Sequence, residues 1–143
     1  MSDPLYKKEI LRLAADAHGA GRLPDPRVTG KAHNPACGDT VSVDLALDKE
    51  GRVSAMAHQT KACVLAQASA SILGEKLKGA SREDVEQLAN AIAAMLVAKA
   101  LPPAPPFDAY GVFDGVIQHR NRHRCVLLPV DAALAAFDES EEN

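Results

Sequence analysis

The stretch VSVDLAL (residues 41–47) alternates apolar side chains with polar or small ones at every position. A period of two predicts a half-buried β-strand. The sequence DKEG (residues 48–51) then predicts a hairpin connection, and residues 52–58 predict the partner strand. Two strands alone are only marginally stable. We therefore expect either a third strand, from residues 27–32 or from the N-terminal loop, or a covering layer of helices.

Helical periodicity marks both sides of this hairpin. Asp3 followed by Pro4 is typical of a helix start, and the segment that they open extends to about Ala17. After the hairpin, Thr60 is a predicted N-cap, because a threonine hydroxyl can accept a backbone amide of the first helical turn. The helix that it opens is expected to end near Leu77.

A capping-box pair, Ser81 and Asp84, opens the next predicted helix. The proline-rich segment 101–106 ends it, because proline lacks the amide that a helix interior requires. Beyond the prolines, the pattern predicts a helical turn over residues 108–116, then a basic loop that reaches Cys125, and a last helix after it.

Strands followed by helices predict an α+β fold, with a small antiparallel sheet, expected to have three strands, packed against a layer of helices. At 143 residues, the chain is long enough to bury about 70% of its unfolded surface as one domain. We therefore assign residues 1–143 to a single domain. Residues 138–143 are acidic and are predicted to form a disordered tail.

Composition argues against several classes of function. The net charge is −3 and the basic residues are scattered, so no electrostatic surface for nucleic acid is predicted. No apolar run reaches the roughly 20 residues that a membrane span needs, and the N-terminus lacks the features of a secretory signal. Three cysteines, an odd number, fit a reducing compartment better than a set of disulfides. We therefore expect a cytoplasmic protein.

The cysteines lie where predicted elements meet. Cys37 and Asp39 stand just before the first strand of the hairpin, and Cys63 stands in the opening turn of a helix just after the second. An antiparallel hairpin brings the start of its first strand beside the end of its second, so these three residues should converge. Cys125 is expected in a loop ahead of the last helix, from which it is free to reach the same place.

Three thiolates and one carboxylate would supply the four ligands that tetrahedral zinc or cluster iron requires. Thiolates favour zinc, copper(I) or iron–sulfur species over magnesium or calcium. Asp39 is a harder ligand than cysteine, so iron held by it should be released more readily. Against this interpretation, a single cysteine is more often a core residue than a ligand. Lone histidines are further candidates, although such residues are more often surface or capping groups: His33, His58 and His123.

Three segments resemble the IscU/SufU/NifU N-terminal family of iron–sulfur cluster assembly scaffolds. The first is NPACGD (residues 34–39), and the second is KACVLAQASAS (residues 61–71), which is similar to the family's cysteine followed by an ASAS helix. The third is RCVLLP (residues 124–129), followed by AAL (residues 132–134). The segments occur in the family's order, and they span most of the chain.

The resemblance implies a three-stranded sheet covered by helices, with Cys37, Cys63 and Cys125 as the cluster-binding cysteines and Asp39 as the family's aspartate. These four residues would bind a transient two-iron cluster, or Zn²⁺ in the cluster-free protein. The resemblance also implies two kinds of partner, a cysteine desulfurase that supplies sulfur and apo-proteins that accept the cluster. Such a scaffold is not itself an enzyme, although a sulfurtransferase-like activity is compatible with it.

Other features resemble the SufU branch, whose members are better described as zinc-dependent sulfur acceptors. The segment between LPPAP (residues 101–105) and Cys125 is longer than in the IscU branch, in which a chaperone site of similar sequence directly precedes the last cysteine. A chaperone partner is therefore left open. Under this alternative, Cys37 and Cys125 are the candidate persulfide acceptors, with Arg124 as a nearby cation. A purely structural zinc domain is a third hypothesis.

Overall fold

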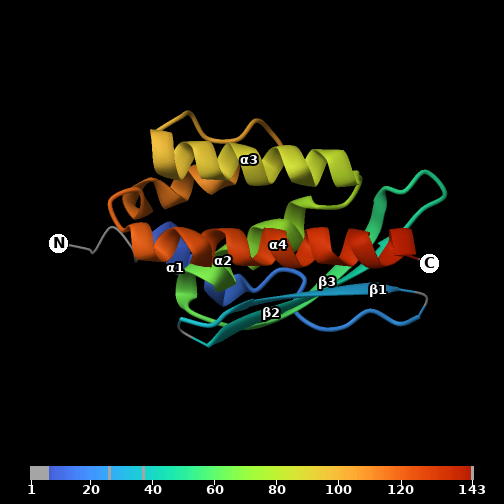
Figure 1. Ribbon diagram of the computed structural model, residues 1–143. Coiled ribbons are helices and arrows are strands. Elements are labelled where there is room, and N and C mark those ends of the chain that lie inside the picture. Colours follow the sequence, from blue (N-terminus) through green and yellow to red (C-terminus); the bar gives the residue numbers. More distant parts are fainter. Residues whose placement is uncertain (1–6, 26, 37, 143) are drawn as a thin grey trace.

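The computed structural model describes residues 7–25, 27–36 and 38–142. Its helices cover one face of an antiparallel sheet (Figure 1), which confirms the predicted α+β class. The elements, in chain order, are α1 (Lys8–Asp16), β1 (Val28–Asn34), β2 (Asp39–Leu47), β3 (Val53–Lys61), α2 (Val64–Lys76), α3 (Arg82–Ala98), the 3-10 helix η2 (Asp108–Val116) and α4 (Arg120–Glu142).

The sheet has three strands in the order β1-β2-β3. The predicted hairpin is therefore confirmed, and β1 is the third strand that residues 27–32 were expected to supply. At the hairpin connection, the carboxylate of Asp48 accepts the amides of Glu50 and Arg52 at 2.9 and 3.0 Å. Gly51 completes the turn with a φ of 79°, a left-handed conformation that glycine adopts without strain.

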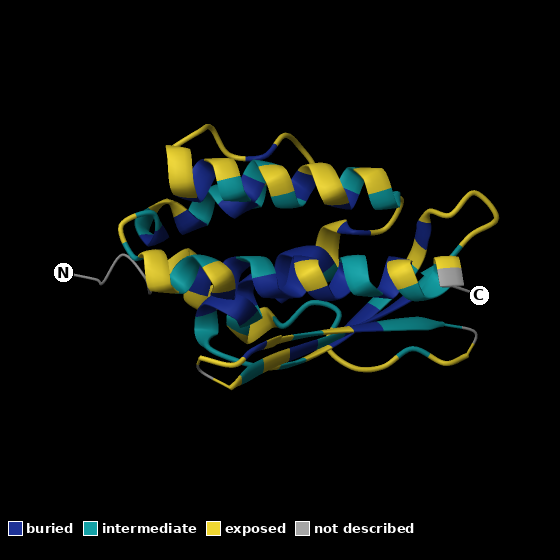
Figure 2. Ribbon diagram, viewed as in Figure 1, coloured by how far each residue is buried: buried dark blue, intermediate teal, exposed yellow. Residues whose placement is uncertain are grey.

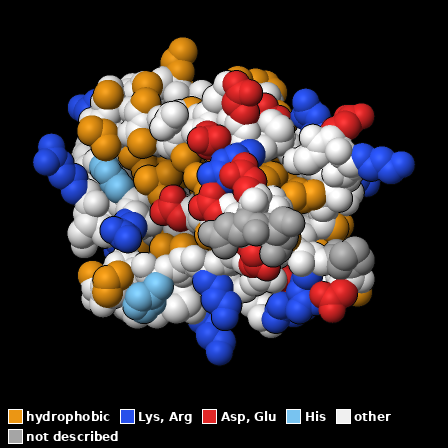
Figure 3. Space-filling model, turned by 45° about the vertical axis from the view of Figure 1, so that its right-hand side comes forward, with side chains coloured by type: hydrophobic (Ala, Val, Ile, Leu, Met, Phe, Trp, Pro, Cys, Tyr) orange, Lys and Arg blue, Asp and Glu red, His pale blue; other side chains and the backbone are white. Residues whose placement is uncertain are grey.

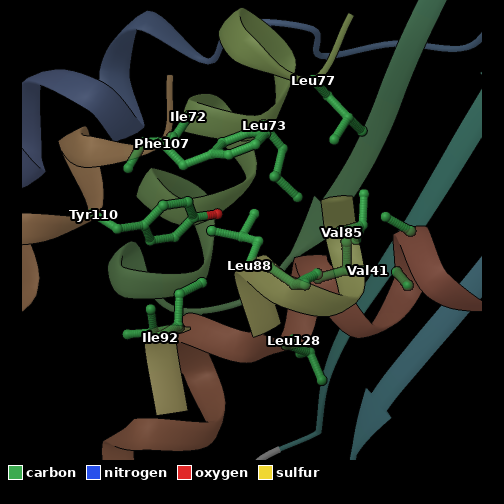
Figure 4. Close-up of a cluster of buried hydrophobic side chains, with 14 of the residues drawn as sticks. Val41, Ile72, Leu73, Leu77, Val85, Leu88, Ile92, Phe107, Tyr110 and Leu128 are labelled. Atoms are coloured by element: carbon green, nitrogen blue, oxygen red, sulfur yellow. The ribbon is translucent and has the colours of Figure 1, made fainter. Parts of the chain in front are cut away.

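Helices α2 and α4 form the layer that lies on the sheet, and α3 packs on the outer side of that layer (Figure 1). Helix α3 exposes its outer side and buries the side that faces α4 (Figure 2). Helix α4 crosses β1 at Gly30, where a Cβ atom would lie 2.1 Å from the backbone of Ala132 and of Ala136. Only glycine allows this approach. The core that results is mainly aliphatic, and the rings of Phe107 and Tyr110 lie among its aliphatic side chains (Figure 4).

Two predicted helix starts can be compared with the structure. The capping box of α3 is confirmed, because the Ser81 hydroxyl accepts the Asp84 amide at 3.2 Å and the Asp84 carboxylate accepts the Ser81 amide at 3.0 Å. The cap predicted at Thr60 is wrong. Thr60 pairs with Val41 inside β3, and the N-cap of α2 is Cys63. The start predicted at Asp3 lies outside the described residues.

Helix α4 is longer at both ends than the sequence predicts. It begins at Arg120, so Cys125 lies within the helix and not in a loop ahead of it. It also continues to Glu142, so the segment expected to be a disordered tail is helical as far as that residue. Arg82 at the start of α3 forms ion pairs with Asp138 and Glu141, which fixes this end of α4 to its neighbour.

The surface carries no broad area of one sign of charge on the face shown in Figure 3, where acidic and basic side chains are interspersed. Within the described ranges, none of the helices combines the length and the apolar character that crossing a bilayer demands.

Candidate metal centre

The hairpin brings Asp39 and Cys63 together as its topology predicts. Asp39 is the first residue of β2, and its neighbour Thr40 pairs with Lys61 near the end of β3. Cys63 follows two residues later as the N-cap of α2. Its amide donates a hydrogen bond to Asp39 Oδ2 at 3.2 Å. The carboxylate at the start of β2 is therefore hydrogen-bonded to the residue at which α2 begins.

Cys125 reaches the same place from α4. One ligand atom each from Asp39, Cys63 and Cys125 lies within 4.8 Å of the other two. Asp39 and Cys63 are half-buried, whereas Cys125 is only 3% exposed. The sequence placed Cys125 in an exposed loop, which is wrong. Cys37, the fourth residue of the predicted set, lies outside the described residues.

The thiol of Cys63 ionises more readily than the thiol of Cys125. A hydrogen bond from the Cys125 thiol is the largest cause that lowers the pKa of Cys63, and the amides of Ala66 and Leu65 act in the same direction against the effect of burial. Together they bring the pKa of Cys63 to about 6. Donation of that hydrogen bond and burial raise the pKa of Cys125. At neutral pH the site therefore contains one thiolate beside one protonated thiol, both free of disulfides.

The donor set fits a soft metal ion. Zinc–sulfur bonds of about 2.3 Å place the sulfurs of a tetrahedral site roughly 3.8 Å apart, so ligand atoms within 4.8 Å of one another need only a small contraction. Two sulfurs and one carboxylate oxygen also match the thiolate-rich sets that select zinc or iron–sulfur species. A third sulfur would complete such a set, and Cys37 stands two residues before Asp39 in the sequence.

Two of the candidate histidines have other partners. His58 is buried between the Thr60 hydroxyl and the His18 carbonyl, each at 2.9 Å from a ring nitrogen, and burial lowers its pKa. His123 Nε2 lies 3.1 and 3.0 Å from the carbonyls that end η2, those of Val116 and Ile117. His33 lies in β1 opposite Thr40.

Arg122 is a neighbour of the site that the sequence did not indicate. It forms a hydrogen bond with Cys125, which acts to lower the pKa of that thiol. The predicted cation, Arg124, instead acts on Asp131 and lowers the pKa of that carboxyl, although burial has the larger, opposite effect. Residues three apart on a helix are neighbours, so the spacing of Arg122 and Cys125 would have identified the contact once both were placed in α4.

Comparisons with known proteins identify the family of the chain. The chain matches the NifU-like N terminal domain over residues 5–119. The scaffold protein IscU of Streptococcus pyogenes is 26% identical over 136 residues, which are 95% of this chain and 84% of that protein. IscU of Azotobacter vinelandii is 31% identical over 101 residues, covering 68% of this chain and 77% of that protein.

Solved structures show the same relationship. The crystal structure of a NifU-like N-terminal protein from Brucella abortus is 32% identical, with a TM-score of 0.92 over 99% of this chain and 97% of that one. FiSufU from Fervidobacterium islandicum, at 19% identity, shares the fold, with a TM-score of 0.83 over 96% of this chain and 99% of that one. The chain belongs to the NifU-like N-terminal domain family, the family of IscU, NifU and SufU iron–sulfur cluster assembly scaffolds.

Proposed function

We propose that this chain assembles an iron–sulfur cluster on Cys37, Asp39, Cys63 and Cys125 and passes it to acceptor apo-proteins. The observation that carries the proposal is the convergence of two free thiols and a carboxylate, with ligand atoms within 4.8 Å of one another, from three separate elements. Family membership supports the same function. Iron and sulfur are the cargo of this site, with sulfur supplied by a cysteine desulfurase.

The protonation of the two thiols suits stepwise loading. Cys63, whose pKa is about 6, is already a thiolate at neutral pH and is available as the first ligand. Cys125 becomes a ligand only after losing its proton, because the thiolate is the metal-binding form. A bound cation favours that loss, and the Arg122 guanidinium, which acts to lower the pKa of Cys125, favours it too.

Asp39 makes the site suitable for release. Its carboxylate is a harder ligand than a thiolate, and one of its oxygens already accepts the Cys63 amide at 3.2 Å. Asp39→Cys should therefore lengthen the lifetime of a bound cluster, because a fourth soft ligand replaces the hard one. An unchanged or shorter lifetime would contradict this role for Asp39.

Anaerobic reconstitution tests the main proposal. The protein is incubated with a cysteine desulfurase, cysteine and iron(II), and the visible spectrum is followed before and after an apo-ferredoxin is added. We expect cluster absorption that moves to the ferredoxin, and its loss in Cys63→Ser and in Cys125→Ser. Asp108→Ala, a change at an exposed carboxylate of η2, is the control and should leave both steps intact. Absence of cluster absorption in the unaltered protein would overturn the proposal.

A second candidate function, zinc-dependent sulfur acceptance, is favoured by the low pKa of the half-buried Cys63. In this reaction a cysteine thiolate attacks the outer sulfur of the desulfurase persulfide. The donor's S–S bond breaks, a new one forms on the acceptor, and the desulfurase cysteine leaves as a thiolate. Bound zinc would keep the acceptor thiols ionised. Burial makes Cys125 a poor acceptor, which leaves Cys37 of the two predicted acceptors, and the low pKa adds Cys63 as a further candidate.

Metal content and persulfide mapping separate the two functions. Protein purified without oxygen is analysed for zinc and iron, exposed to desulfurase and cysteine, and digested for mass spectrometry. Tightly held zinc with a persulfide on one cysteine, and no transferable cluster, would favour sulfur acceptance. Zinc that can be removed only with loss of the fold, without sulfur uptake, would indicate a structural zinc domain.

A further inference from the structure

The helix that carries Cys125 lacks one internal hydrogen bond just after that residue. Pro129 lies in the interior of α4, and proline has no amide to donate to the carbonyl four residues earlier. That carbonyl belongs to Cys125. The proline ring also crowds it. The turn of α4 that carries Cys125 therefore has one helix hydrogen bond fewer than its neighbours, and contacts from outside the helix weigh more there.

A buried pair of hydroxyl groups supplies a contact at this point. The Ser69 hydroxyl of α2 donates to the carbonyl of Val126, the residue after Cys125, at 2.7 Å. Ser69 gives its one hydroxyl proton to Val126, so the Tyr110 hydroxyl is the donor toward Ser69. Its single proton is shared between Ser69 Oγ at 2.9 Å and the Ser69 carbonyl at 3.2 Å. Ser69, Tyr110 and Val126 are all fully buried, and Figure 4 shows the Tyr110 hydroxyl pointing into the core.

The contact joins α2, whose N-cap is Cys63, and α4, which contains Cys125. Ser69 lies on α2, which begins just after Cys63, and Val126 adjoins Cys125 on α4. Burial raises the pKa of Tyr110, so its hydroxyl keeps the proton that it donates. A buried hydroxyl that loses its hydrogen-bond partner destabilises the fold. A shift of the Cys125 turn away from α2 would leave the Ser69 hydroxyl in that state, so such a shift is unfavourable.

We infer that Ser69 and Tyr110 are positioning residues for the metal centre, because they hold the Cys125 turn, where Pro129 removes one helix hydrogen bond, at ligand distance from Cys63. The inference rests on the proposed function of this site as a metal-binding one. It assigns to the first serine of the ASAS segment a role toward α4. The second, Ser71, instead accepts the His18 amide at 3.1 Å and tethers the loop after α1.

Ser71 provides a matched control. It lies on the same helix and is equally buried. Its change to alanine removes the contact with His18, whereas Ser69→Ala removes the contacts with Val126 and Tyr110. We expect Ser69→Ala and Tyr110→Phe to weaken Co²⁺ binding about 10- to 100-fold, the range typical of residues that support metal ligands. The absorption of Co²⁺–thiolate charge transfer reports the binding. Ser71→Ala should stay within about threefold, although it also lowers the unfolding midpoint in chelator.

Two further measurements complete the test. Pro129→Ala restores an amide for the Cys125 carbonyl, so adding it to Ser69→Ala should recover a large part of the lost affinity. In metal-free protein, alkylation of the buried Cys125, followed by peptide mass spectrometry, should be faster in Ser69→Ala and in Tyr110→Phe but not in Ser71→Ala. Equal effects of Ser69→Ala and Ser71→Ala on Co²⁺ affinity and on alkylation would overturn the inference. Absence of Co²⁺–thiolate absorption in the unaltered protein would instead overturn the proposed function, and alkylation would still decide the positioning role.

Discussion

Replacing Cys125 with alanine should raise the pKa of Cys63 in the metal-free protein. The Cys125 thiol donates the hydrogen bond that contributes most to lowering the pKa of Cys63 to about 6. The Cys125→Ala variant lacks this donor, whereas the amides of Leu65 and Ala66 remain at the start of α2. The Cys63 thiolate would therefore lose its strongest stabilising contact and keep the weaker ones.

The expected shift follows from the strength of such a bond. A hydrogen bond to a charged group contributes about 1.5–3 kcal/mol, and one pKa unit corresponds to about 1.4 kcal/mol. Loss of the bond should therefore raise the pKa of Cys63 by roughly 1–2 units, from about 6 to between about 7 and 8. At pH 7 the thiolate fraction would fall from about 90% to between about 10% and 50%.

The rate of alkylation by iodoacetamide measures this change. The protein is kept in chelator, the rate is followed between pH 5 and pH 9, and the Cys63 peptide is quantified by mass spectrometry. Cys125→Ser is the matched variant, because its hydroxyl can still donate, and its midpoint should stay nearer to that of the unaltered protein. A midpoint that remains near 6 in Cys125→Ala would refute the reasoning and assign the low pKa to the helix N-terminus alone.

Three further predictions concern the stability of the scaffold around the site. Asp44 is 1% exposed, and its carboxylate accepts a hydrogen bond from Arg22 Nε at 2.7 Å. Burial raises the pKa of Asp44, but the hydrogen bonds that the carboxylate accepts outweigh burial and lower the pKa. Because the folded pKa of Asp44 lies below the unfolded value, this stabilisation is complete above about pH 4 and is lost as the pH falls. Asp44→Asn should lower the free energy of unfolding in urea by about 3 kcal/mol at pH 7 and should weaken its decrease at acidic pH. An unchanged decrease at acidic pH would contradict this. Gly74→Ala should cost about 2–3 kcal/mol, since its Cβ would lie 1.9 Å from the His18 carbonyl oxygen; an unchanged thermal midpoint would argue against this contact. Ser81→Ala removes one half of a capping box and should cost about 1 kcal/mol, measured as a lower urea midpoint with an unchanged m-value.

The part of the site on the hairpin could be predicted because local rules determine it. Alternation over residues 41–47 fixes the face of β2 that is buried, and a hairpin must return the chain to its start, so Asp39 and Cys63 meet whatever else the fold does. Even here the boundary of α2 was misplaced. Thr60 carries the side chain of a helix cap, but threonine also suits a strand, and pairing with β2 extends β3 through Lys61.

The part of the site on α4 could not be predicted, because the local signals there oppose a helix. The first turn contains Arg120 and Arg122 and no acidic residue, and positive charges at a helix N-terminus oppose its dipole by about 0.3–1 kcal/mol each. Pro129 then removes a hydrogen bond inside the helix. Local reasoning therefore favours a loop up to Cys125. What overrides these terms is burial of Val126 and Leu128 in the shared core.

The same core also hides the support of the cysteine from sequence patterns. By its composition, the ASAS segment is a run of small residues, which predicts close helix packing but no particular hydrogen-bond partner. Its partners are remote, since Ser69 bonds to Val126 and Tyr110, whereas Ser71 bonds to His18. A hydroxyl that bonds across the fold has no period along the chain, so hydrophobic patterning cannot detect it. The pairing depends on the packing of α2 against α4, and that packing is also what brings Cys125 to Cys63.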